Sequence, residues 1–154
     1  FEYYQLLADD TGVKLQLSGH GAVYGDGTML DRMISNLLSN ALRYTPPDSA
    51  ISVRIDPNGD MISLSVQNPG EEIAAEHLPR LFDRFYRADP ARREGATNNA
   101  GLGLAIVKSL VDVHGGTVGC ASGAGHTTFT ISLPAWDRDA HHPTYTNAPA
   151  PSLG

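Results

Sequence analysis

Four polar or aromatic side chains between residues 36 and 44 recur at the spacing of one helix face. At about 100° of rotation per residue, Asn36, Asn40 and Arg43 fall on one narrow stripe, and Tyr44 lies at its edge. Amide oxygens are suitable ligands for a hard cation, and a guanidinium with a nearby ring suits phosphate and a base. The stripe therefore predicts chemistry on a magnesium-bound nucleotide, ATP above all.

The alternative is that an asparagine pair four residues apart simply forms the solvated side of an amphipathic helix. Two later glycine segments favour a site: the turn Asn68-Pro69-Gly70, and Gly-Leu-Gly-Leu at 101–104. A glycine after Asn68 allows backbone to approach a planar base, and free amides at a helix start attract phosphate oxygens. Each glycine segment alone is more often a plain turn or cap, so the prediction depends on the three segments together.

A dense group of arginines follows the turn in an otherwise acidic chain. Five of the eleven basic residues lie within fourteen positions: Arg80, Arg84, Arg87, Arg92 and Arg93. A triphosphate or an acidic partner surface would relieve their mutual repulsion. A solvated segment in which the arginines alternate with acidic residues explains the same pattern equally well.

Composition limits the class of protein. The 154 residues, 41% of them hydrophobic, suffice for one domain, which we place at 1–135, with a disordered tail at 136–154. The net charge of -6 argues against nucleic acid as a partner, since phosphate binding requires a basic surface. The single cysteine, Cys120, fits a reducing compartment and a small core residue. We find no apolar run of the roughly 20 residues that a membrane-spanning helix needs.

Periodicity predicts the elements that must position these groups. The first half contains a helix at 1–9, a strand at 13–17, a short strand at 22–24, a helix from the N-cap Asp26 to 45–47, and a hairpin of 51–55 with 61–66. The second half contains a short helix at 76–81, an irregular arginine-rich loop reaching Asn99, a buried helix at 102–113, and a hairpin of 117–121 with 127–133. The long second helix should carry its broad apolar face opposite the asparagine stripe.

In this order the segments resemble the catalytic and ATP-binding domain of bacterial sensor histidine kinases, whose fold is shared with gyrase-type and chaperone ATPases. Residues 36–44 resemble the family's N box, 68–73 its first glycine box, 82–87 its F box and 101–104 its second glycine box. The resemblance covers 1–135 and implies an α+β, two-layer α/β sandwich with a mixed, mostly antiparallel sheet packed on helices. The amino-acid sequences of the motifs are most similar to those of the heavy-metal (copper or silver) sensor kinases.

The resemblance assigns roles to individual residues. It implies that Asn40 binds Mg²⁺ and the phosphates, with Asn36 as a supporting group and second candidate ligand. Arg43 would contact phosphate, Tyr44 would pack near the base, and Asn68 would bind adenine. The complete predicted set for ATP is Asn36, Asn40, Arg43, Tyr44, Asn68, Gly70, Ile73, Phe82, Arg87, Gly101, Leu102, Gly103 and Leu104.

Four positions depart from the patterns of related proteins. Asn68 stands where Asp is usual, so adenine recognition should be retained but altered. Glu72 and Asn99 stand where glycines are common, which implies a stiffer or less complete lid. Asn36 stands where the related ATPases carry the Glu that activates water, which favours phosphate transfer over hydrolysis.

The phosphate acceptor is not predicted within this chain. The histidines at 20, 77, 114 and 126 lack the His-Glu/Asp helix context of an acceptor, and the His141-His142 pair belongs to the tail. The resemblance therefore implies an upstream dimerisation and phosphoacceptor domain and a response regulator as partners. It also implies a cytoplasmic domain, monomeric in isolation, of an inner-membrane sensor. The alternatives are a degenerate nucleotide-binding or interaction module, and a serine kinase of the same fold.

Overall fold

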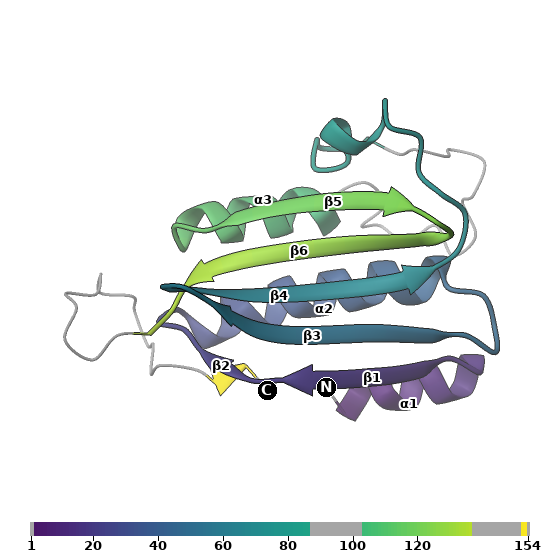
Figure 1. Cartoon of the computed structure of the whole chain (residues 1–154), viewed down its shortest axis with the longest axis horizontal. Coiled ribbons are helices and arrows are strands. Elements are labelled where there is room, and N and C mark those ends of the chain that lie inside the picture. The colour runs from purple at the N-terminus through teal and green to yellow at the C-terminus, as the bar shows by residue number, and fades with distance from the viewer. Residues whose placement is uncertain (1, 87–102, 137–151, 154) are drawn as a thin grey trace.

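Alternating apolar and polar residues along five strands make one face of a sheet apolar, and helices cover that face (Figure 1). The computed structural model describes residues 2–86, 103–136 and 152–153. The order across the sheet is β1-β3-β4-β6-β5, in which β1 and β3 are parallel and the other neighbours are antiparallel. The strands of this sheet are β1 (Lys14–Gly19), β3 (Ala50–Asn58), β4 (Met61–Pro69), β5 (Thr117–Gly123) and β6 (His126–Pro134).

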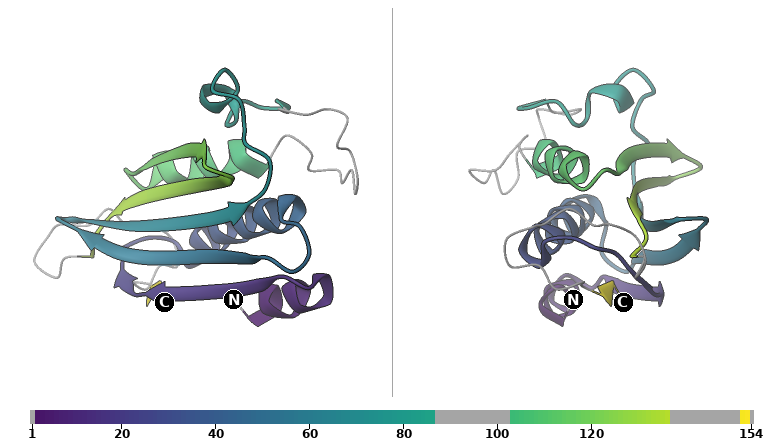
Figure 2. Two further views of the ribbon diagram at one scale, coloured as in Figure 1. Left: turned by 45° about the vertical axis from the view of Figure 1, so that its right-hand side comes forward. Right: turned by 90° about the vertical axis from the view of Figure 1, so that its left-hand side faces the viewer.

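Three helices lie in a second layer behind the sheet. They are α1 (Glu2–Thr11), α2 (Gly27–Tyr44) and α3 (Gly103–Val113). The edge-on view in Figure 2 shows all three on the same side of the strands. This arrangement confirms the predicted α+β, two-layer sandwich with a mixed, mostly antiparallel sheet.

The core lies between the two layers and uses every second strand residue. On β6, for example, Phe129, Ile131 and Leu133 are buried. The helices contribute five side chains to the same core, and these are nearly inaccessible to solvent: Met33, Leu37, Leu38, Val107 and Val111. Burial of each large aliphatic side chain contributes about 1.5–3 kcal/mol, so this layer is the main source of stability.

Local signals fix both ends of α2. The Asp26 side chain accepts a hydrogen bond from the Met29 N–H at 3.1 Å, which is the N-cap that the sequence predicted. At the other end the Thr45 hydroxyl donates to the Ala41 carbonyl at 2.6 Å, and Pro46 follows the C-cap. Proline disfavours helical backbone in the residue before it, so the helix stops where the sequence indicates.

A buried histidine joins the start of α2 to the end of α3. His114 is 5% exposed, its Nε2 accepts from the Asp26 N–H at 3.3 Å, and its Nδ1–H donates to the Leu110 carbonyl at 2.8 Å. A Cβ at position 25 would lie 2.6 Å from the ring, so only Gly25 permits this approach. His114 therefore has a structural role, because it connects the two helices.

The helix predicted at 102–113 is present, but the expectation that it is buried on nearly every side is wrong. Within α3 only Val107 and Val111 are buried, while Val113 is 57% exposed. Lys108 and Asp112 form an ion pair at 2.7 Å on its solvated face. A helix in the outer layer of a two-layer fold has no second sheet to cover it, whatever its average hydropathy.

Two short elements also differ from their predictions. The helix expected at 76–81 is a 3₁₀ turn, η1 (Leu78–Arg80), because Pro79 removes a backbone N–H and the run is too short for an α-helix. The strand expected at 22–24 is β2 (Gly21–Ala22), which pairs with β7 (Ser152–Leu153) rather than with a sequence neighbour. The predicted disordered tail therefore contains one short strand, and 137–151 lie outside the described residues.

The single cysteine behaves as a small core residue, as predicted. Cys120 lies half-buried against the core on β5, and burial raises the pKa of its thiol to about 11.

Among the described helices, none combines the length and apolar character needed to cross a membrane.

We predict that Asp26→Ala lowers the free energy of unfolding by about 1 kcal/mol, because the Met29 N–H loses its cap. Urea denaturation followed by circular dichroism measures the change. Asp31→Ala is the matched control, since Asp31 is exposed on the same helix and has no capping role. Equal stability of the Asp26 variant and the wild type would contradict the assignment of the cap.

Candidate functional site

The asparagine stripe of α2 lies where α2 meets α3. Asn36 and Asn40 are half-buried, whereas Arg43 and Tyr44 are exposed. The Asn36 Nδ2 donates to the Gly103 carbonyl at 3.4 Å, which ties the middle of α2 to the first residue of α3. Asn36 and Asn40 therefore lie at the border of the buried face of α2. The prediction that the asparagine stripe lies opposite this face is wrong.

Asn68, the residue predicted to bind the base, lies near the C-terminal end of β4. Asn68 is 5% exposed and continues the inward alternation of Leu64 and Val66. Its Nδ2 donates to the carbonyl of Pro69 at 3.1 Å. A buried amide at the end of a core strand is a polar group placed where the apolar core stops, which is the arrangement expected of a binding site.

A close backbone approach joins this end of β4 to the end of α2. Gly70 has φ +147°, and a Cβ there would lie 3.0 Å from the Tyr44 carbonyl oxygen. A side chain at position 70 would therefore push the two segments apart. The approach observed at Gly70 is to the protein's own backbone, and the approach to a planar base that the sequence analysis expects there stays a prediction.

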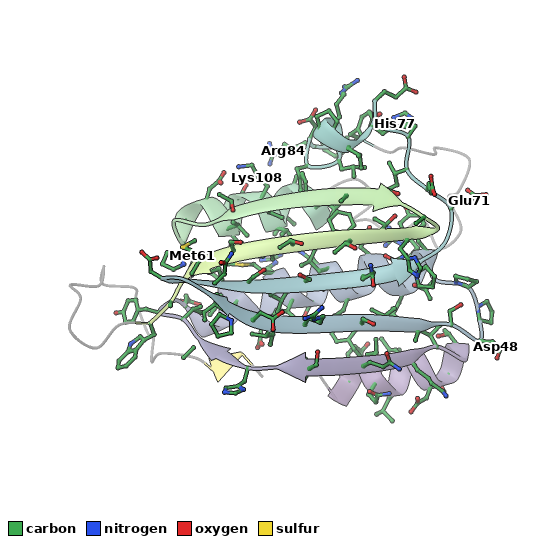
Figure 3. The ribbon with its side chains drawn as sticks, in the orientation of Figure 1. Asp48, Met61, Glu71, His77, Arg84 and Lys108 are labelled. Carbon is green, nitrogen blue, oxygen red and sulfur yellow. The ribbon has the colours of Figure 1, made fainter. Side chains whose placement is uncertain are left out.

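The chain then leaves the sheet and forms a turn that packs back on the core. Figure 3 labels Glu71 beyond the end of β4 and His77 in the projecting turn. Ile73 and Phe82 are half-buried against the core, and the Phe82 ring meets Phe129 edge-on with centroids 6.1 Å apart. Leu104 of α3 is half-buried and also packs against this core.

The described arginines of this turn support the solvated-segment reading more than a polyanion site. Arg80 pairs with Asp83 at 3.5 Å, and its guanidinium lies 4.5 Å from the ring centroid of Tyr86. The Tyr86 hydroxyl in turn contacts His77 Nδ1. Arg80 is therefore engaged within its own turn. Figure 3 labels Arg84 at the same projecting turn.

Several predicted site residues cannot be placed. Arg87, Gly101 and Leu102 lie outside the described residues, as do Arg92, Arg93 and Asn99. The His141-His142 pair also lies outside them. Within the described ranges, no group of three or more His, Cys, Asp or Glu side chains could hold a metal ion.

One buried polar residue near Asn68 was missed by the sequence analysis. Thr127 is 6% exposed, and the strand register places it opposite Asn68 on β6. The available signal was the alternation of β6, because Thr127 occupies the inward position two residues before Phe129. Its relation to Asn68 required the register between β4 and β6, which the sequence alone does not specify.

The geometry thus gathers the C-terminal half of α2, the end of β4 and the start of α3 into one region. Residues 25–137 match the family model for histidine kinase-, DNA gyrase B-, and HSP90-like ATPases. The chain belongs to this family. Family membership means an ATP-binding domain, and it agrees with the motif order recognised in the sequence.

Relatives in this family narrow the resemblance to sensor kinases. The chain is 54% identical over 135 residues to the sensor histidine kinase CusS of Escherichia coli O157:H7, covering 87% of this chain and 28% of the relative. It is 54% identical over 101 residues to the sensor protein CopS of Pseudomonas syringae pv. tomato, covering 66% of this chain and 21% of the relative. The chain thus spans about a quarter of the length of these curated relatives.

A solved structure agrees with the sequence relatives. The mycobacterial sensor histidine kinase MprB superposes with a TM-score of 0.73 at 27% identity, covering 87% of this chain and 90% of that chain. The fold is therefore shared along most of both chains.

We predict that Gly70→Ala weakens binding of a fluorescent ATP analogue by roughly tenfold. The new Cβ would meet the Tyr44 carbonyl, and the positive φ adds a strain of about 1–2 kcal/mol for a residue with a side chain. Fluorescence titration measures the affinity. Gly59→Ala is the control, because Gly59 also has a positive φ but no atom lies within 4 Å of its Cβ position. Wild-type affinity in Gly70→Ala would refute the importance of this contact.

Proposed function

We propose that this chain is the catalytic domain of a two-component sensor histidine kinase, and that it binds Mg-ATP and donates the γ-phosphate to a histidine on an upstream dimerisation domain. The main support is that the Asn36 to Tyr44 face, Asn68 with Gly70, and the start of α3 meet in one region. Membership in the ATPase family and the names of the relatives support the same proposal.

The amide groups of α2 are suited to a magnesium site. The Asn36 Nδ2 is used by the Gly103 carbonyl, so its oxygen is the atom left for a cation. Asn40 is half-buried, and no hydrogen bond joins its side chain to any other described residue. Mg²⁺ prefers oxygen ligands and keeps several waters, and when bound it would neutralise charge on the phosphates. We assign Asn40 as the protein ligand and Asn36 as its support.

The other predicted residues divide into a phosphate end and a base end. Arg43 is exposed one turn after Asn40, where its guanidinium can bind phosphate oxygens. Asn68 offers an amide oxygen and nitrogen at the base end, and Tyr44, 40% exposed, is close to this end because its backbone carbonyl approaches Gly70. Ile73 and Phe82 complete the apolar side on which a planar base could pack.

Phosphate transfer is favoured over hydrolysis by the residue at position 36. A carboxylate there could remove a proton from water, whereas the Asn36 amide cannot act as a base. Its hydrogen bond to Gly103 also gives it a structural role between two helices. Phosphoryl transfer needs mainly positioning and charge stabilisation, which the remaining residues can supply.

The described histidines do not resemble phosphate acceptors. His114 is buried with both ring nitrogens bonded, and His77 contacts Tyr86. His20 and His126 are exposed, but neither lies on a helix. We therefore place the acceptor in an upstream phosphoacceptor domain, with a response regulator as the next partner. The proposed parent is an inner-membrane sensor of copper or silver, of which this monomeric domain is a cytoplasmic part.

We predict that Asn40→Ala lowers the Mg²⁺-dependent part of the affinity for a fluorescent ATP analogue about tenfold and leaves binding without Mg²⁺ nearly unchanged. Loss of an outer-shell partner of a metal ligand costs about 10- to 100-fold in metal affinity, so loss of a direct ligand should cost at least about tenfold. Titration with Mg²⁺ and with EDTA separates the Mg²⁺-dependent part of the affinity from binding without Mg²⁺. Ser39→Ala is a control from the exposed part of the same turn. A wild-type chain that binds no ATP analogue would favour the degenerate interaction module.

We further predict that the isolated chain binds ATP but does not retain the γ-phosphate, and that it turns ATP over slowly. Incubation with γ-labelled ATP and a separate assay of released phosphate measure the two properties. Adding a domain with the acceptor histidine should produce an acid-labile phosphohistidine. Stable self-labelling of this chain, or an acid-stable phosphoserine on the partner, would contradict the proposed reaction.

A further inference from the structure

The segment that follows β4 rests on the turn between β5 and β6. The Gly70 N–H donates to the Gly125 carbonyl at 3.0 Å, and the Gly125 N–H donates to Glu72 Oε1 at 3.0 Å. Gly125 thus bonds to the segment through both of its backbone groups. One of these two bonds depends on a side chain, that of Glu72, at a position where a glycine is common in the family.

A second connection lies three residues after Gly70. The Ile73 N–H donates to the Ser122 hydroxyl oxygen at 2.8 Å, and that hydroxyl lies 3.1 Å from Thr127 Oγ1. The Ser122 oxygen has two lone pairs, so it can accept from the amide while either hydroxyl donates in the bond between Ser122 and Thr127. Thr127 is buried opposite Asn68, so this chain of bonds runs from Ile73 to the neighbourhood of the proposed base-binding residue.

The turn that receives these bonds is well defined. Ala124 and Gly125 are its two loop residues, with φ of +53° and +78°, the pattern of a type I′ hairpin turn. The pairing of β4 with β6 continues to Pro69 and His126, immediately beside the turn. The turn is therefore held by the sheet, whereas residues 70–74 have no helix or strand of their own.

We propose that Ser122 and Glu72 are positioning residues of the nucleotide site, which fix the segment 70–73 on the β5–β6 turn and thereby set the adenine side of the site. This inference rests on the proposed function. The two side chains act through Gly70, Ile73 and Thr127, and neither needs to touch the nucleotide. Glu72 replaces the flexibility of a glycine with a hydrogen bond, so the segment is held in place before ATP arrives and less ordering is needed on binding.

The test uses fluorescent ATP and GTP analogues with the wild type and matched pairs of variants. Glu72→Ala removes the bond to Gly125, and Ser122→Ala removes the bonds to Ile73 and Thr127. Each variant should weaken binding of the ATP analogue by at least about three- to tenfold, the factor typical of one hydrogen bond. Ser122→Thr keeps a hydroxyl and Glu72→Gln keeps an acceptor oxygen, so both should stay within about twofold. Thr130→Ala, on the same hairpin, should have no effect.

Base selectivity separates positioning from general loss of stability. If the segment sets the adenine side, the alanine variants should lose affinity for the ATP analogue and bind the GTP analogue as before, so the ratio of the two falls. A purely structural role would lower both affinities together with the melting temperature. That second pattern, or an unchanged affinity in either alanine variant, would overturn the role of the residue concerned.

Amide hydrogen exchange of the wild type provides a test that needs no variant. The Ile73 and Gly125 amides should be protected in the nucleotide-free chain, since each donates to one of the two side chains. Fast exchange of these amides in the folded protein would overturn the inference while the proposed function stands. Failure of the wild type to bind any ATP analogue would instead remove the proposed function, and this inference with it.

Discussion

The packing of α2 against the sheet and beside α3 is the constraint on which the rest of this structure depends. Leu37 and Leu38 are fully buried, and the rotation of the helix then fixes where every other residue of α2 can lie. Asn36 and Asn40 fall at the border of the buried face, half-buried beside α3, where an amide can face a ligand and still be held by neighbours. His114 at one end and the Asn36 to Gly103 bond further along hold the same two helices in register.

The scaffold and the site are stabilised by different forces. The core between the layers consists of large aliphatic and aromatic side chains, and burial of each contributes about 1.5–3 kcal/mol to the stability of the fold. The segment after β4 is held by single hydrogen bonds of about 1 kcal/mol each, and by the Phe82 contact with Phe129. A rigid platform bearing a more weakly held segment suits phosphoryl transfer, because that reaction depends on positioned groups and on admission and release of a nucleotide.

The elements predicted best are those whose signals are local. The second helix begins at its Asp26 cap and ends before Pro46, and the hairpin of β3 and β4 follows the alternation of its residues. The errors at α3 and β2 share one cause, which is that a local sequence pattern does not report which elements pack or pair with a segment. The apolar composition of α3 indicated burial on all sides, but the fold provides cover on one side only. The partner of β2 is a strand near residue 152, too distant in sequence for any local pattern to identify.

The sequence by itself determined the type and spacing of the groups on α2, the glycine at position 70 and the family, because helical rotation, backbone freedom and motif order are local properties. Only the tertiary structure decided that Thr127 lies opposite Asn68 and that Gly70 approaches Tyr44. It also decided that Glu72 bonds to Gly125 and that Ser122 bonds to Ile73. These relations depend on strand register and on the docking of a hairpin turn. Both are set by the burial of side chains far apart in the chain, which no single segment encodes.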